Sequence, residues 1–164
     1  MPARLWLSWK NYPDAKIIGQ PQTFKLFEQF FRHPMTDRYV AVKEGDQLAL
    51  GKHTLQFVKA PMVHWPEVIM SYDLTDHVLF SADAFGQFGT VGNVYADQVD
   101  FEENYLDSAR RYYVNIVGKY GPQVVNVLKK ASGLPIDFIC PLHGFVFRTP
   151  ATIKYIIDKY LHWA

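Results

Sequence analysis

The first half of the chain alternates apolar and polar side chains with the period of a β-strand. Residues 39–43, 47–50 and 53–58 are short runs of this kind, separated by turns that contain Gly, and this arrangement predicts an antiparallel meander. Residues 68–72 and 77–80 repeat the pattern around an Asp-rich turn and predict one further hairpin. We therefore expect a mainly antiparallel sheet in this part of the chain.

A helical period flanks these strands on the N-terminal side. Residues 16–19 predict a short buried strand, and a helix is expected to begin at Pro21, a residue that favours the first helical turn. Aromatic side chains recur along one face of this helix, and burial in a core is the more common fate of such a stripe than contact with a cofactor. The residues of this stripe are Phe24, Phe27, Phe30 and Phe31.

The second half of the chain is predominantly helical. Asp100 with Glu103 resembles a capping box, and apolar residues at helical spacing follow it. A second helix is expected over residues 124–131, a short strand over 136–140, and a last amphipathic helix from Pro150. Strands followed by interleaved helices indicate an α/β layered domain, without any linker or internal repeat.

Composition limits the classes of function. The chain has 164 residues, of which 49% are hydrophobic, so it can bury the core of one domain. Its 17 Lys and Arg balance 16 Asp and Glu, and no basic run is present, which argues against a nucleic-acid partner. Cys140 is the single cysteine, so an internal disulfide is excluded and a reducing cytoplasm is the expected location.

The opening segment, residues 1–10, is apolar and rich in Trp. It is too short and too interrupted by charge for a signal peptide or a membrane span, and no later run reaches membrane length, so we expect no membrane association. Chain termini are usually polar, whereas this one resembles the middle of a buried helix.

Three candidate metal ligands each follow an apolar, strand-like run. His64 and His143 are followed by residues that end a strand, and Asp83 lies just past another run. Imidazole nitrogens and carboxylate oxygens are common metal donors, and a carboxylate can bridge two ions. A metal site at strand ends is therefore one hypothesis for these residues, although spacing alone favours ordinary loop histidines and a capping aspartate.

Four segments strengthen the first interpretation because they resemble the successive signatures of the flavodiiron proteins, also called A-type flavoproteins. They are residues 60–67, 79–86, 110–116 and 139–144, and they follow the order and nearly the spacing of that family. The resemblance implies a metallo-β-lactamase-like αββα sandwich with a non-haem diiron centre. Such a centre reduces dioxygen to water or nitric oxide to nitrous oxide, with electrons from FMN in a flavodoxin-like domain.

The resemblance also assigns roles to residues. It implies that His64 is a terminal ligand of one iron, that His143 is a terminal ligand of the other, and that Asp83 bridges the two. Tyr112 or Tyr113 would approach the pocket as a hydrogen-bond donor, although plain helix packing explains either residue as well.

Other residues near these motifs receive secondary roles. Trp65 and Phe85 are expected to form walls of the pocket, whereas Glu67 and Asp76 are expected to be structural or solvated. The remaining histidines are expected at the surface or on strands, namely His33, His53, His77 and His162.

The sequence departs from the family at both ends. The His-x-Glu-x-Asp-His motif, which supplies the other iron ligands, would lie just before residues 1–5 and does not occur in the chain. Residues 155–164 resemble the helix that leads into the flavodoxin-like domain. We therefore expect residues 1–164 to form a partial metallo-β-lactamase-like domain that is incomplete at its N-terminal end and has no FMN site.

Three functional hypotheses follow. The favoured one is a fragment or truncated homologue of a flavodiiron oxidoreductase, which needs the missing segments for activity. Its partners would be a complementing N-terminal fragment or further copies in a homo-oligomer, and a flavodoxin-like or rubredoxin-like electron donor. The alternatives are a non-catalytic binding module that oligomerises to cover an exposed sheet edge, and a hydrolase with one metal ion. Dioxygen and nitric oxide both remain open as substrates.

Overall fold

The computed structural model describes residues 11–32 and 38–164. The apolar opening segment, residues 1–10, and His33 lie outside the described residues, so the predictions for them stay predictions. The chain divides into two compact units, Met1–Val42 and Lys43–Ala164. Within the part of the chain described, no helix combines the length and the apolar composition needed to cross a membrane.

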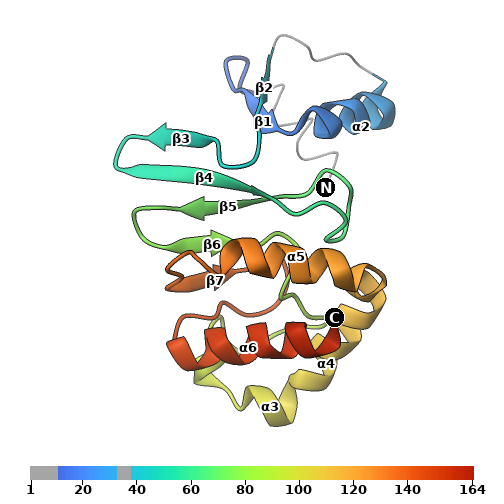
Figure 1. Cartoon of the computed structure of the whole chain (residues 1–164), viewed down its shortest axis with the longest axis vertical. Coiled ribbons are helices and arrows are strands. Elements are labelled where there is room, and N and C mark those ends of the chain that lie inside the picture. Colours follow the sequence, from blue (N-terminus) through green and yellow to red (C-terminus); the bar gives the residue numbers. More distant parts are fainter. Residues whose placement is uncertain (1–10, 33–37) are drawn as a thin grey trace. The chain divides into compact units, whose positions relative to one another are not determined.

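The first unit contains a small parallel sheet. Strand β1 (Ile17–Gly19) pairs with β2 (Tyr39–Ala41), and helix α2 (Pro21–Phe31) lies between them in sequence (Figure 1). The prediction that residues 39–43 belong to the antiparallel meander was therefore wrong. A helical connection brings the chain back to run beside β1 in the same direction, and this pairing takes precedence over a hairpin to the next strand.

The aromatic stripe of α2 is only partly buried. Phe24 and Phe27 are in the core, and Phe24 stacks on Tyr39 with ring centroids 3.9 Å apart. Phe30 is 64% exposed and Phe31 is half-buried, so the prediction that the whole stripe is core was wrong for its C-terminal end. The four aromatic side chains spread over a wide arc of the helix surface. The two short strands of this unit cover only part of that arc, so the last two aromatic residues are less buried.

The second unit is built on a five-stranded sheet in the order β3-β4-β5-β6-β7. The first four strands form an antiparallel meander, and β7 is parallel to β6. The predicted hairpins over residues 47–58 and 68–80 are confirmed. The strands are β3 (Gln47–Leu50), β4 (His53–Lys59), β5 (Ile69–Asp73), β6 (Val78–Phe80) and β7 (Phe138–Cys140).

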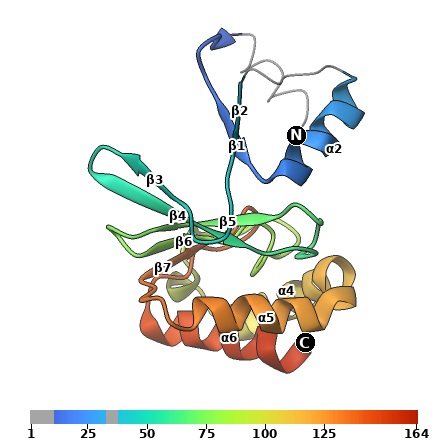
Figure 2. The same cartoon turned by 45° about the horizontal axis from the view of Figure 1, so that its top comes forward.

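Helices cover one face of this sheet. Figure 2 shows α5 (Gly121–Ala131) and α6 (Pro150–Trp163) side by side against it. The segment between β6 and α5 holds α3 (Phe101–Asn104) and α4 (Leu106–Tyr112), where one continuous helix was expected. Shorter helical turns complete the unit, namely η2 (Ala96–Gln98), the π-helical η3 (Tyr113–Val117) and η4 (Gly118–Tyr120).

The two faces of the sheet differ in burial. Met70, Leu79 and Ile139 point toward the helices and are at most 2% exposed. Because side chains alternate along a strand, their neighbours point to the opposite face, where Phe80 is 47% and Leu50 is 55% exposed. The strand pairing places these two exposed side chains on the same face.

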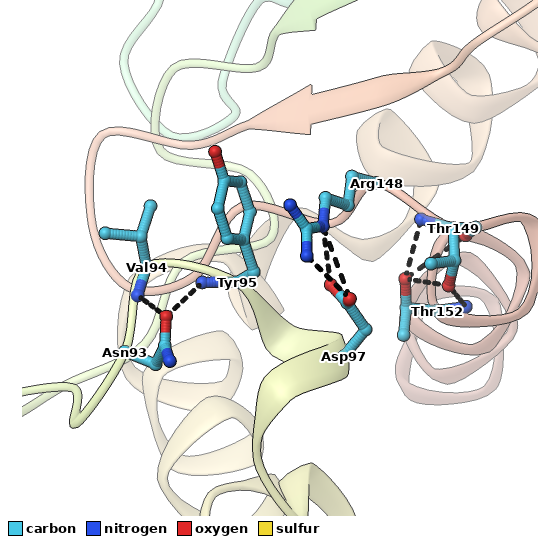
Figure 3. Close-up of polar contacts among 7 residues, drawn as sticks. All are labelled: Asn93, Val94, Tyr95, Asp97, Arg148, Thr149 and Thr152. Carbon is cyan, nitrogen blue, oxygen red and sulfur yellow. Dashed lines mark hydrogen bonds and ion pairs between the residues drawn. The ribbon is translucent and has the colours of Figure 1, made fainter.

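A polar clamp fixes the start of α6. The Arg148 guanidinium donates to both carboxylate oxygens of Asp97, over 3.1 and 3.0 Å, and lies 3.6 Å from the centre of the Tyr95 ring (Figure 3). The Thr149 side chain caps α6 by accepting the N–H of Thr152, and the helix begins at Pro150 as expected. The clamp thus ties the loop before α3 to the chain that leads out of β7.

Candidate metal centre

His64 lies in the loop that leaves β4. This loop folds back on itself, because the N–H of Ala60 donates to the carbonyl of Val68 over 3.0 Å and the N–H of Met62 donates to that of Trp65 over 2.8 Å. Met62 adopts a left-handed backbone conformation with a φ of 65°, which is uncommon for a residue with a side chain. The result is a compact turn that leaves the His64 side chain 30% exposed.

Asp83 lies in the loop that leaves β6, and two buried hydrogen bonds fix the conformation of this loop. The hydroxyl of Ser81, a fully buried residue, donates to the carbonyl of Ala84 over 2.9 Å. The N–H of Phe85 donates to the hydroxyl of Tyr160 on α6 over 2.7 Å. Both bonds are buried, and because the second one joins the loop to α6, the position of Asp83 depends on the docking of this helix.

His143 follows β7 and reaches the same place from a third loop. The N–H of Leu142 donates to the carbonyl of Ala82 over 2.8 Å, which ties this loop to the one that carries Asp83. Gly144 has a φ of +94°, a conformation that side chains rarely adopt. A Cβ at Gly144 would lie 2.7 Å from Cγ of Gln87, so the turn after His143 requires glycine for two reasons.

The structure brings the predicted ligands together. Nε2 of His64 lies 3.6 Å from Oδ2 of Asp83, and Nε2 of His143 lies 3.4 Å from Oδ1 of the same carboxylate. These distances exceed those of normal N–H···O hydrogen bonds. Two donors that bind the same ion at about 2.1 Å are separated by about 3.0–3.4 Å, so the His143–Asp83 distance lies at the upper end of that range and the His64–Asp83 distance slightly beyond it.

The Asp83 carboxylate lies between the two imidazoles. Each of its oxygens faces a different histidine, so the three side chains would hold one ion on either side of the carboxylate if two ions were bound. Imidazole nitrogen with carboxylate oxygen is a donor set that suits iron. Two such ions have more coordination positions than these three side chains can fill. Most of the positions would therefore be left for other groups.

A cavity of about 470 Å³ adjoins the three side chains. Tyr112 is part of its lining, and its ring centroid lies 6.0 Å from that of His143. Burial, with a further contribution from the Asp83 carboxylate, raises the pKa of Tyr112, so the phenol keeps its proton and can donate a hydrogen bond. A Cβ at Gly86 would lie 2.8 Å from the Tyr112 ring, so glycine makes room for this side chain.

Tyr113 lies elsewhere. It packs in the core against Tyr160 and Trp163, with centroid distances of 4.9 and 5.4 Å. Its buried hydroxyl has no hydrogen-bond partner among the residues described. Of the two tyrosines, Tyr112 is therefore the one that the structure places beside the candidate site.

The two expected wall residues lie beside the cavity rather than in its lining. Trp65 is 42% exposed, with its ring 6.2 Å from that of His64. Phe85 packs on Tyr160 and lines a separate apolar cavity of about 290 Å³ under the sheet. The apolar lining is formed instead by side chains to which the sequence assigned no role, namely Phe88, Ile116 and Leu142. Their positions within the family-like segments, or just beside them, were the available signal.

A second group of donors is unrelated to this site. His53 and Asp73 share a hydrogen bond of 2.7 Å between Nδ1 and Oδ2, and Asp76 lies 3.8 Å from the same nitrogen. The Asp76 side chain is 61% exposed, as expected for a solvated residue. His77 pairs with Asp137 over 3.0 Å. These are histidines of strands and turns that hydrogen-bond to carboxylates.

Comparison with known families supports the resemblance. The sequence model described as "ODP family beta lactamase" matches residues 4–144. The anaerobic nitric oxide reductase flavorubredoxin of Klebsiella pneumoniae is 37% identical over 93% of this chain and 31% of its own length. The rubredoxin-oxygen oxidoreductase of Megalodesulfovibrio gigas is 36% identical over 75% of this chain and 31% of its own length.

Solved structures give the same answer. The flavodiiron protein of Giardia intestinalis superposes with a TM-score of 0.86 at 26% identity, over 94% of this chain and 37% of that one. Rubredoxin oxygen:oxidoreductase of Desulfovibrio gigas superposes with a TM-score of 0.83 at 32% identity, over 90% of this chain and 37% of that one. The chain thus spans about a third of the length of these relatives. It belongs to the ODP family of β-lactamase-like proteins and corresponds to part of the β-lactamase-like core of the flavodiiron proteins.

Proposed function

We propose that His64, Asp83 and His143 are the downstream ligands of a two-iron centre, and that residues 1–164 are a partial domain of a flavodiiron-type oxidoreductase. The observation that carries the proposal is the Asp83 carboxylate, which presents one oxygen to each imidazole at 3.6 and 3.4 Å. A carboxylate that only capped a loop would not need a histidine on either side.

The names of the relatives indicate the class of substrate. One is a nitric oxide reductase and another is an oxygen oxidoreductase, so the substrate proposed for this chain is a small diatomic molecule, dioxygen or nitric oxide. When bound, iron would supply the redox chemistry and the binding position for that molecule. FMN would come from a flavodoxin-like domain, and a rubredoxin-type protein would donate electrons.

The residues of this chain would orient and protect the reactants. Asp83 would hold the two ions at a fixed spacing, and the hydrogen bond from Phe85 to Tyr160 would hold its loop. Tyr112, protonated because it is buried near a carboxylate, would donate a hydrogen bond inside the cavity. Phe88, Ile116 and Leu142 would limit the access of water to it.

The three donors are fewer than two iron ions need. The proposal therefore requires further donors from outside these 164 residues, either from the same polypeptide or from a partner, in a homo-oligomer or with a complementing fragment. On its own, the purified chain is expected to bind iron substoichiometrically and to show no flavin absorbance.

Metal analysis after addition of a segment that carries the His-x-Glu-x-Asp-His motif tests this proposal. The expected result is two iron ions per assembled domain, with loss of at least one ion in His64→Ala and His143→Ala. His162→Ala is the matched control, because His162 is an exposed residue of α6. Full iron binding by the chain alone that survives Asp83→Asn would contradict the proposed ligand set.

A further inference from the structure

The apolar cavity of about 290 Å³ lies between the larger sheet and the helices that cover it, and the proposed function does not use it. Strands β5, β6 and β7 supply one wall, and helices α5 and α6 supply the other. The side chains that face it are almost all apolar. They include Met70, Leu79 and Ile139 of the strands and Val127, Ala131 and Ile157 of the helices. The cavity therefore lies within the hydrophobic core of the second unit.

The lining determines which molecules fit the cavity. A buried water needs about two to four polar partners, and among the described residues this lining offers hardly any polar atom. Apolar cavities of about 150 Å³ are already large enough to bind benzene or xenon. The size and the lining together therefore favour a small, uncharged and apolar molecule.

The cavity reaches the loops that carry two of the proposed ligands. Val63 and Ala84 line it, and they are the sequence neighbours of His64 and Asp83. His64 and Asp83 themselves line the other cavity, the one at the candidate metal centre. The two loops therefore form a wall, with the apolar cavity on one side and the candidate metal centre on the other.

The cavity also reaches the surface of the second unit. Leu161 of α6 lines it and is 46% exposed. The exposed residues Lys129 and Ser132 line it at the end of α5. This part of the cavity therefore gives a small molecule an entrance between the two helices.

We propose that this cavity binds a small apolar molecule, and that dioxygen or nitric oxide collects in it beside the metal centre. The transfer of an apolar solute from water into an apolar environment is favourable, and both diatomic molecules are small and uncharged. The cavity would thus concentrate the substrate next to the loops that carry His64 and Asp83. The identity of the ligand rests on the proposed function, whereas the affinity of the cavity for apolar molecules does not.

Xenon is a suitable first probe, because it is apolar and needs neither metal nor electrons to bind. The methyl resonances of the full chain, without added metal, are followed by NMR as the xenon pressure rises. Val127→Phe and Ala131→Phe, made singly and together, narrow the cavity from adjacent turns of α5. Val114→Phe is the matched control, since Val114 is 64% exposed on η3 and does not line the cavity.

Dioxygen then tests the identity of the ligand, because it is paramagnetic and speeds the relaxation of nearby nuclei. The methyl groups of Val63 and Leu79 line the cavity, whereas Val117 is just as deeply buried but lies outside the lining. Under oxygen pressure, we expect faster relaxation at Val63 and Leu79 than at Val117.

The xenon experiment has three expected results. Methyl resonances of the lining shift and reach a plateau as the pressure rises. Val127→Phe and Ala131→Phe weaken xenon binding several-fold, most strongly in combination, and Val114→Phe leaves it unchanged. The denaturation midpoints of the two cavity variants are unchanged or raised, because the new rings gain apolar contacts in the cavity.

Three outcomes would overturn the inference. Shifts without a plateau, or shifts that are equal in the combined Val127→Phe and Ala131→Phe variant, would show that xenon is not bound in the cavity. Lowered denaturation midpoints in both single variants, with Val114→Phe unchanged, would show that the core has no room there. Equal relaxation by dioxygen at Val63 and Val117 would remove the diatomic ligand. The proposed metal centre fails separately, in the iron analysis, because none of these measurements involves a metal ion.

Discussion

At the scale of single residues, unusual backbone conformations gather around the proposed ligands. Met62, Ala82 and Phe85 have φ values of 65°, 52° and 67°, and they lie within two positions of His64 or Asp83. Such conformations are costly for residues with side chains, and they tend to persist where the surrounding structure holds a functional group in place. The loops that carry the ligands are thus held by packing and hydrogen bonds rather than by local preference.

Gly144→Ala tests how tightly the His143 turn is packed. Both Gly144→Ala and the control Gly51→Ala place a side chain at positive φ, which costs about 1–2 kcal/mol, but only at Gly144 does the new Cβ meet other atoms. We expect Gly144→Ala to lose a further 1–3 kcal/mol, roughly the cost of overpacking. Urea denaturation of both variants measures the difference, and equal losses would contradict the contact with Gln87.

The Arg148–Asp97 clamp predicts a dependence of stability on pH. Its hydrogen bonds hold the pKa of Asp97 below the ordinary value. A depressed pKa in the folded state adds stability above the unfolded value of about 3.9 and loses it as the pH falls through the folded pKa. Asp97→Asn should therefore reduce stability at pH 7 but much less near pH 2. Thermal denaturation at both pH values measures this, and a loss independent of pH would contradict it.

At the scale of secondary structure, helix α6 packs against the loop that carries Asp83. Tyr160 is fully buried, packs on Phe85 with centroids 4.6 Å apart, and accepts the backbone N–H of Phe85. The loop that carries Asp83 is therefore attached to a helix more than seventy residues later in the chain. This dependence links the stability of the C-terminal helix to the geometry of the proposed ligands.

Tyr160→Phe tests this link. It keeps the ring but leaves the N–H of Phe85 without an acceptor, which is expected to cost about 1–3 kcal/mol. Iron binding in the assembly with the added segment that carries the His-x-Glu-x-Asp-His motif should weaken as well, because the Asp83 loop loses an anchor. Tyr12→Phe is the control, since Tyr12 is 66% exposed. Chemical denaturation of the chain and metal analysis of the assembly provide the two readouts, and unchanged values in Tyr160→Phe would show that packing alone holds the loop.

At the scale of the whole molecule, one face of the larger sheet carries exposed apolar side chains. Phe80 and Leu50 lie on this face, opposite to the one that the helices cover. In a sandwich fold a second sheet packs on such a face. We therefore propose this face as the place where another segment, or a further copy of the chain, would pack.

Phe80→Ser tests whether this face drives association. Because Phe80 is 47% exposed, the substitution should lower the free energy of unfolding by only about 1 kcal/mol, roughly half the value of a fully buried Phe. It should lower the apparent mass of the chain at high concentration, measured by light scattering. Val114→Ser is the control, since Val114 is 64% exposed on η3. An unchanged mass in Phe80→Ser, or an equal change in the control, would contradict this role.

Local pattern was sufficient for much of the fold. The β3–β4 and β5–β6 hairpins follow from turn residues between alternating strands, and the Thr149 cap and Pro150 mark the start of α6. Local pattern gave the wrong pairing for Tyr39–Ala41, because the sequence of a strand does not specify which strand lies beside it. It also failed for Phe30, because periodicity shows which side of a helix is apolar but not how far the neighbouring elements extend.

The sequence by itself determined the family, the types of donor and the fact that His64, Asp83 and His143 end strand-like runs. These are local properties that a short segment carries wherever it lies. The tertiary structure alone decided that each Asp83 oxygen faces a different imidazole and that Tyr112 rather than Tyr113 lies in the cavity. Such facts depend on how loops far apart in the chain meet over one sheet, and no local pattern encodes those distances.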